Sequence, residues 1–177
     1  MNKEAAGDDV GLTLPIGFVT KALVGLFGSD KLRLAVVADG STFFNGFSVD
    51  NANGIVDQPR LLRFKAYTNY DNYVSVGAWT KITINNTDYN DHGAFDAANN
   101  HLVAPLNGTC LFGATLFYKI NANTTARVRG RFVVNGTTEL RGSLGELSAT
   151  NVSLVTAIWL QTIVPLSAGD TVEPQGY

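Results

Sequence analysis

Two long runs in the second half of the sequence are apolar on both sides, and they constrain the fold more than any other feature. In an extended strand, alternate residues point to opposite faces of the sheet. Over 109–120, one side carries Cys110 and Phe112 and the other carries Leu111 and Phe117. This alternation predicts a strand that contacts apolar groups on both of its faces.

The second run, 152–166, has the same property. Leu160 and Val164 lie on one side, and Trp159 and Ile163 lie on the other. An antiparallel sheet normally buries one face and leaves the other polar, so a sheet built from these runs needs a cover on its second face. Self-association about an axis supplies that cover economically, and the alternative is the chain's own N-terminal region.

The rest of the sequence reads as short strands joined by turns, which predicts an all-β chain. A small β meander is expected over 30–57, and one or two turns of helix are expected at 18–27 before it. We expect an attachment region at 1–59 and an antiparallel sandwich at 60–177. Its predicted strands lie near 63–68, 73–84, 100–104, 109–121, 126–134, 137–143, 151–165 and 171–176, and Asn-Gly at 135–136 is the clearest hairpin turn.

Composition narrows the function. Charged residues make up only 16% of the 177 residues and the formal net charge is −2, so we expect no nucleic-acid binding. The most apolar early stretch, 22–27, is too short to cross a bilayer, so we expect no membrane insertion. The polar, acidic start does not resemble a signal peptide, which predicts synthesis in the bacterial cytoplasm.

Catalysis is not expected. The two histidines, His92 and His101, are not spaced with other residues as in a known catalytic or zinc motif, and no cofactor or metal is predicted. Asp88 and Asp91 suit solvated loop carboxylates, with a calcium site as the alternative. Hydrolysis of a glycan is a third, minor hypothesis.

Two groups of side chains are candidates for ligand binding. Arg127, Arg129 and Arg131 share one face of a predicted strand, where they could bind acidic sugars or phosphate. Alternatively they form ion pairs with Glu139 or Glu146 on neighbouring strands.

The second group is aromatic and lies in Asn- and Asp-rich segments. Such side chains suit stacking on sugars, although ordinary exposed loop positions would look the same. The candidates are Tyr67, Tyr70, Tyr73, Tyr89 and His92.

The order of three segments resembles a known family. The first segment, Phe64-Lys-Ala, lies near the start of the expected sandwich. The second, 95–112, begins with Phe-Asp, continues through Ala-Pro and Asn-Gly, and ends in an aromatic strand. The third, 164–172, has the sequence Val-Pro-Leu-Ser-Ala-Gly-Asp-Thr-Val. This pattern resembles the globular head of the complement and tumour-necrosis-factor superfamily. The resemblance implies a jelly roll over about 64–177 and a homotrimer, in which Leu111, Phe117, Trp159 and Ile163 face the axis and Cys110, Phe112, Leu116, Leu160 and Val164 face the core.

The sequence departs from this family in its last strand. No counterpart of the aromatic Ser-x-Phe-x-Gly-Phe run precedes the end at Tyr177, and Pro174 removes a donor from the expected penultimate strand. The resemblance therefore implies an open slot in the inner sheet. We expect a strand from the N-terminal region or from another protein to fill it.

The whole chain also resembles proteins of tailed phages and gene transfer agents, through the segments 39–50, 54–59, 79–82 and 158–161. This resemblance implies a spike or fibre protein on the surface of a virion or phage-like particle. Its expected role is host adsorption through an envelope or capsular polysaccharide. The alternative is a structural adaptor or decoration protein that trimerises and docks another subunit.

Overall fold

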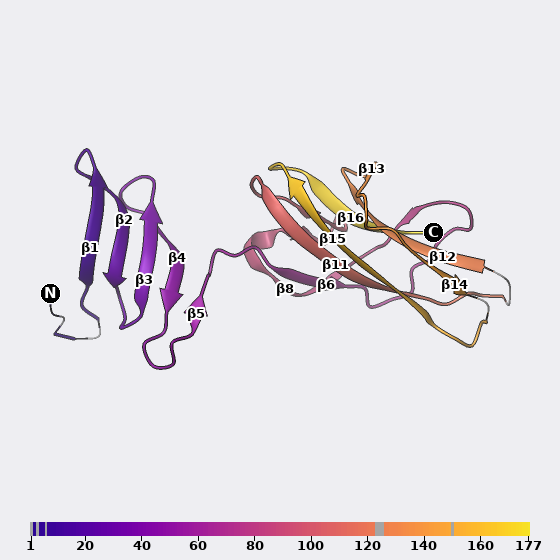
Figure 1. Ribbon diagram of the computed structural model, residues 1–177, viewed down its shortest axis with the longest axis horizontal. Coiled ribbons are helices and arrows are strands. Elements are labelled where there is room, and N and C mark those ends of the chain that lie inside the picture. The colour runs from indigo at the N-terminus through magenta and orange to yellow at the C-terminus, as the bar shows by residue number, and fades with distance from the viewer. Residues whose placement is uncertain (1, 3, 6, 123–125, 150) are drawn as a thin grey trace. The chain divides into compact units, whose positions relative to one another are not determined.

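The computed structural model describes residues 2, 4–5, 7–122, 126–149 and 151–177, and within them the chain is all-β (Figure 1). The expectation of an all-β fold built from antiparallel sheets is confirmed. The chain divides into two compact units, Met1–Leu62 and Arg63–Tyr177. The predicted boundary at residue 59 lies close to this division.

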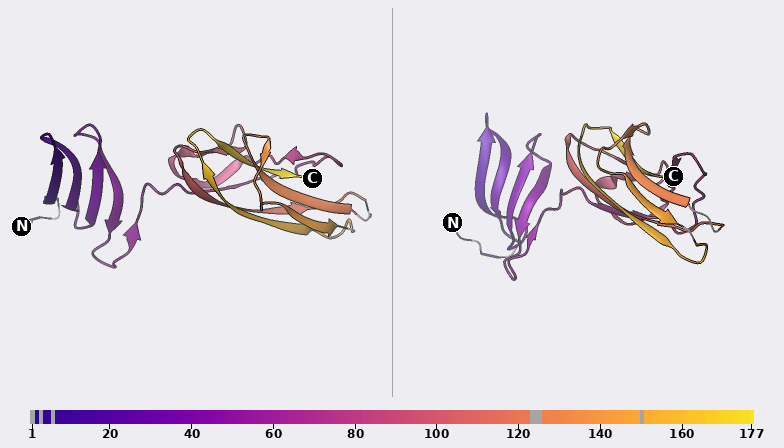
Figure 2. Two further views of the ribbon diagram at one scale, coloured as in Figure 1. Left: turned by 45° about the horizontal axis from the view of Figure 1, so that its top comes forward. Right: turned by 45° about the vertical axis from the view of Figure 1, so that its right-hand side comes forward.

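The N-terminal unit is a single five-stranded antiparallel sheet in chain order (Figure 2). Its strands are β1 (Val10–Ile16), β2 (Val19–Leu26), β3 (Leu32–Val37), β4 (Phe43–Val49) and β5 (Val56–Asp57). The short helix expected at 18–27 is wrong, because these residues form β2 and its turn. Gly17 and Phe18 both have positive φ angles, 57° and 68°, which close a tight β1–β2 hairpin.

The C-terminal unit places its largest sheet opposite two smaller ones. The seven-stranded sheet has the path β13-β12-β16-β10-β9, with β14 also paired to β12 and β7 to β16. These strands are β7 (Thr80–Lys81), β9 (Phe95–Asp96), β10 (His101–Val103), β12 (Ala126–Val134), β13 (Thr138–Glu139), β14 (Gly145–Ala149) and β16 (Thr171–Gly176). The smaller sheets pair β11 (Gly108–Tyr118) with β15 (Thr156–Leu166) and β6 (Phe64–Tyr67) with β8 (Asn86–Asn90).

Aromatic contacts tie these layers together. Phe112 of β11 packs on Phe132 of β12 with ring centroids 5.9 Å apart, and Phe64 of β6 stacks on Phe95 at 5.4 Å. On β12, the neighbouring Val133 is fully buried as well. The arrangement is compatible with a β-sandwich, in which inward side chains of facing sheets form one core.

Pro174 is compatible with the sheet because its nitrogen, which lacks a hydrogen to donate, lies between the two short strands that pair with β16 on one side. On one edge, β16 pairs with β10 at residues 171–172 and with β7 at residues 175–176. The Pro174 carbonyl accepts a hydrogen bond from the Ile82 amide on that side. On the other side, Phe132 makes its hydrogen bonds with Ser143 and Leu140, so no ladder donor is lost.

Some of the predicted strands are shorter than expected, and the structure also contains strands that the sequence did not predict. The runs predicted at 73–84 and 137–143 contain only β7 and β13, of two residues each. The strands β1, β8, β9 and β14 were not predicted. A 3-10 turn, η1 (Asp91–Gly93), follows β8.

Candidate functional site

The outward face of the β11–β15 sheet is apolar and open in the single chain. Leu111 lies opposite Ile163, and Trp159 lies opposite Thr115, so these side chains share one face. Leu111, Ile163, Phe117 and Trp159 are 64%, 69%, 73% and 81% exposed. Together they expose on the order of 600 Å² of apolar surface, which matches the largest patches that monomeric proteins normally show.

The second edge of β11 has no strand beside it in the described part of the chain, because β11 pairs only with β15. The burial of the core-facing residues shows the consequence. Leu160 and Ile158 of β15 are buried, whereas their partners Ala114 and Leu116 on β11 are only half-buried. Cys110 is half-buried as well, so the core is incompletely covered along β11.

A hollow of about 520 Å³ lies along this edge. Its walls come from β6, β11 and β15, so it lies between the open edge of β11 and the short β6–β8 sheet. The lining residues are Ala66, Gly113, Ala114, Thr115, Trp159, Leu160 and Gln161. None of them is charged, which suits an added strand better than a charged ligand.

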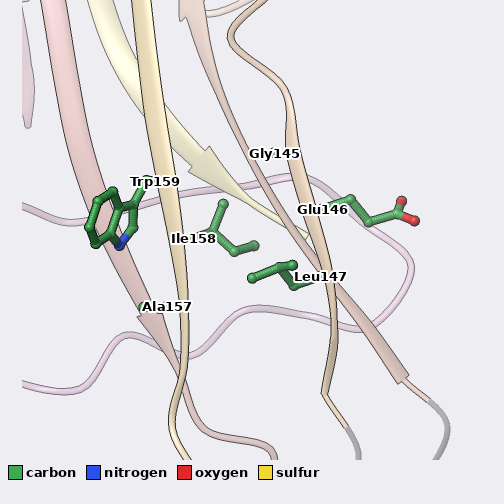
Figure 3. Close-up of a pocket in the computed structure, with 6 residues that line it drawn as sticks. All are labelled: Gly145, Glu146, Leu147, Ala157, Ile158 and Trp159. Atoms are coloured by element: carbon green, nitrogen blue, oxygen red, sulfur yellow. The ribbon is translucent and has the colours of Figure 1, made fainter.

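A second, smaller hollow of about 330 Å³ opens where β14 meets β15. Figure 3 shows Ile158 and Leu147 pointing toward one another across this margin, while Trp159 projects from the other side of β15. Glu146 points away from the hollow (Figure 3). The hollow therefore lacks the converging polar groups that orient a small-molecule ligand.

The predicted arginine row lies on one face of β12, and its guanidinium groups have carboxylate partners. Arg127 Nη1 lies 2.9 Å from Glu146 Oε1, and Arg129 Nε also donates to Glu146. Arg131 Nη1 lies 2.8 Å from Glu139 Oε2. Arg129, and then Arg127, hold the pKa of Glu146 below its usual range.

Two of these arginines also stack on aromatic rings. The Arg131 guanidinium lies 4.0 Å from the Trp79 ring centroid and donates to Gln175 Oε1, and the Arg129 guanidinium lies 5.1 Å from the Tyr177 ring. These contacts and the ion pairs occupy much of the hydrogen-bonding capacity of the row. The geometry matches the ion-pair alternative more closely than an anion site.

The predicted tyrosines are only partly brought together. Tyr89 lies opposite Lys65 on the β6–β8 sheet, and Tyr67, two residues along β6, shares that face. Lys65 Nζ lies 2.6 Å from Asp88 Oδ2, and this contact, helped by the two tyrosines, raises the pKa of Lys65.

The other aromatic candidates lie elsewhere. Tyr70 and Tyr73 sit in the loop after β6, with Tyr73 77% exposed. His92 lies in the turn η1 with a φ angle of 61°. Only Tyr67 and Tyr89, of the predicted set, form a continuous polar and aromatic surface with Lys65 and Asp88.

The carboxylates considered for calcium have other partners. Asp88 pairs with Lys65, and Asp91 Oδ2 lies 2.8 Å from Arg63 Nε. Among the described residues, no group of three or more His, Cys, Asp or Glu side chains could hold a metal ion.

One buried polar cluster was missed by sequence reasoning. Glu173 is 6% exposed, its Oε2 lies 2.6 Å from Lys81 Nζ, and its Oε1 accepts a hydrogen bond from Gln175. Gln175 in turn accepts from Arg131. The signal was the alternation of Glu173 and Gln175 around Pro174, which marks one face of β16 as polar.

No protein-family model matches the chain, and no curated protein matches it significantly. The described residues include no helix long and apolar enough to span a membrane.

Proposed function

We propose that this chain is a non-enzymatic spike or fibre protein of a phage-like particle, assembled as a homotrimer through its C-terminal unit. The observation that carries the proposal is the outward face of β11–β15, where Trp159 is 81% exposed and Phe117 is 73% exposed. An exposed apolar patch of this size often marks a protein–protein interface. In this proposal the unit is a jelly roll, and three copies bury these faces around a common axis.

The proposed role on the particle surface is attachment to a host envelope or capsular polysaccharide. The surface formed by Tyr67, Tyr89, Lys65 and Asp88 supports it, because exposed tyrosine rings stack on sugars while charged neighbours bind hydroxyl groups. The arginine row contributes less in this proposal, since its guanidinium groups are paired with Glu139 and Glu146.

The assembly is tested by the mass of the full chain in solution, by sedimentation over a dilution series. We expect three times the chain mass of 18.9 kDa. The double variant Phe117→Asp/Trp159→Asp should raise the concentration at which the trimer dissociates by at least about 100-fold, because each charge would be buried unpaired. Val76→Asp is the matched control, because Val76 is 99% exposed in a loop. A monomeric wild-type chain would contradict the proposal.

Attachment is tested by binding of the purified protein to host envelope polysaccharide. Tyr67→Ala/Tyr89→Ala should abolish binding, and Arg127→Gln should leave it unchanged, because Arg127 lies on β12 within the ion-paired row. Loss of binding in Arg127→Gln with retention in the tyrosine variant would reverse this assignment.

A second candidate function, a structural adaptor, is favoured by the open edge of β11. An unpaired strand edge beside an uncharged hollow can accept an added strand through main-chain hydrogen bonds. The proposed occupant is an extended strand with apolar residues on both sides, from an N-terminal region or from another particle protein. Amide hydrogen exchange over Gly108–Tyr118 tests it: protection should rise in assembled particles relative to the purified trimer, and equal protection would contradict docking.

A further inference from the structure

The N-terminal sheet has one face made entirely of apolar side chains. In the sheet register, Leu12, Val24, Leu34 and Phe47 lie side by side across β1–β4. Directly opposed residues of an antiparallel sheet point to the same face, so this row is continuous. The rows on either side, which run from Leu14 to Phe44 and from Val10 to Val56, contain only Val, Leu, Ala and Phe.

A β-bulge in β4 keeps this face apolar. The register shifts between Leu34 and Ala35, so that Leu34 faces Phe47 and Ala35 faces Asn45. Without the shift, strict alternation along β4 would turn either Phe44 or Phe47 to the opposite face. The bulge thus places both rings on the apolar face.

This face remains open in the single chain. Leu12, Leu34, Val36 and Phe44 are 57%, 39%, 48% and 41% exposed. At its rim the Arg60 guanidinium lies 4.4 Å from the Phe44 ring centroid. The seven most exposed side chains of the three rows present on the order of 600 Å² of apolar surface, close to the roughly 800 Å² that each partner buries in a stable interface.

The other face of the same sheet is mixed in polarity. It carries the polar residues Thr13, Arg33, Asn45 and Ser48 beside the apolar residues Leu23, Ala35, Val37 and Phe43. The contrast shows that the sheet is amphipathic, and a sheet with one wholly apolar face must bury it against another layer.

We infer that this apolar face packs against the same face of two further copies of the chain, so that three sheets enclose a dry core around a threefold axis. The inference rests on the trimer of the proposed function but uses a separate surface. An identical face is a fitting partner, because the three rows offer no charge or hydrogen-bonding group through which a polar partner could be recognised.

The width of the sheet suits three copies. Four to five strands spaced about 4.8 Å apart make a face roughly 14–19 Å wide. In a three-sided prism with sides of this width, the central axis lies about 4–6 Å from each sheet. Sheets that pack face to face are about 10 Å apart, so the side chains of each sheet normally fill about 5 Å, which is the same depth. Leucine, valine and phenylalanine side chains therefore fill the prism without a central void.

Symmetry also favours three copies over two. If the C-terminal units form closed trimers, pairwise packing of the N-terminal sheets would leave one of the three sheets uncovered within each trimer, or would require contacts between separate trimers. If both units share one threefold axis, the N-terminal and the C-terminal apolar faces are all buried within a single trimer.

The test uses the full chain and the dilution series described above. Leu34→Asp places a carboxylate in the centre of the inferred core and should raise the dissociation concentration of the trimer by at least about 100-fold. Leu12→Asp, on a more exposed position, is the second variant. Thr13→Asp is the matched control on the adjacent residue and the opposite face, and it should stay within about twofold of the wild type.

Combination with Phe117→Asp/Trp159→Asp separates the two interfaces. We expect the double variant to remain a weakened trimer and to become a monomer when Leu34→Asp is added. Dissociation unchanged by Leu12→Asp and Leu34→Asp, or dimers held by the N-terminal sheet, would overturn the inference and leave the C-terminal trimer intact. If Leu34→Asp alone gave monomers while the double variant had no effect, the proposed C-terminal interface would fail and the inference would stand.

Discussion

The two units of this chain use β-structure in opposite ways. The C-terminal unit buries many side chains within the single chain, with Leu102 2% exposed and Val133 fully buried, although its core stays partly open along β11. The N-terminal sheet buries only Ala35 and Val37 to a similar degree, each 4% exposed. The difference teaches that one unit carries its stability within the single chain, while the other depends on whatever covers its apolar face.

Leu102→Ala gives the largest expected effect and tests the first half of this contrast. Removal of a leucine side chain from a closed core costs about 2–5 kcal/mol. The loss should be independent of protein concentration when unfolding is monitored by tryptophan fluorescence, because Trp79 and Trp159 both lie in the C-terminal unit. A loss below about 1 kcal/mol would mean that this core is not closed.

Gly25→Ala tests the N-terminal sheet in the same way. A Cβ at Gly25 would collide with the backbone of Val10 and Gly11, so β1 must shift, at a cost of about 1–3 kcal/mol. Amide exchange over β2 and β3 should accelerate while the tryptophan transition stays unchanged. Gly46→Ala is the control, because its Cβ would meet its nearest neighbour, the Leu34 carbonyl oxygen, at 3.8 Å.

Within the C-terminal unit, two arginines of the row on β12 should contribute differently to stability. Arg131→Gln should lower the stability by about 1–2 kcal/mol, because it removes an ion pair and a cation–π contact at a largely buried position. Arg127→Gln should have an effect below about 0.5 kcal/mol, since Arg127 is exposed. Equal effects in chemical denaturation would show that the stacking on Trp79 contributes nothing.

The smallest expected effect is a pH dependence at Tyr118. Its hydroxyl donates to the Arg129 carbonyl oxygen at 2.5 Å, and burial raises its pKa to about 12. The folded pKa lies above the ordinary value of 10.0, so this contribution is complete below pH 10 and is lost as the pH rises toward 12. The thermal midpoint of Tyr118→Phe should fall less than that of the wild type over this range.

Much of the C-terminal unit follows from local patterns. The two doubly apolar runs became β11 and β15, and their alternation placed Leu111, Phe117, Trp159 and Ile163 on one face because a strand has a period of two. Asn135 and Gly136 both have positive φ angles, 51° and 70°, as the hairpin prediction required. The trimer itself stays a prediction.

The N-terminal sheet was harder to predict because its signals were locally ambiguous. Residues 19–26 are apolar at nearly every position, so a short helix and a strand fit equally well. β1 was not predicted because it contains Gly11 and Pro15, two residue types that are uncommon inside strands. The structure accommodates Pro15 through a shift in the β1–β2 register between Leu14 and Pro15. The bulge in β4 also broke the simple alternation that would have revealed the apolar face.

The buried Lys81–Glu173 pair escaped prediction for a different reason. The two residues are far apart in sequence and meet only because β7 pairs with β16. No spacing rule within either strand records that meeting. The same holds for Trp79, whose ring under Arg131 depends on the fold rather than on any local motif.

The half-buried thiol of Cys110 gives the open edge of β11 a chemical reporter. Cys110 is the chain's single cysteine, and it faces the core beside the unpaired edge. A strand added there would shield the sulfur from water, so the rate of its alkylation should measure how fully the edge is occupied. A spectroscopic label attached at the same atom would follow the arrival of a partner strand in real time, without an engineered cysteine.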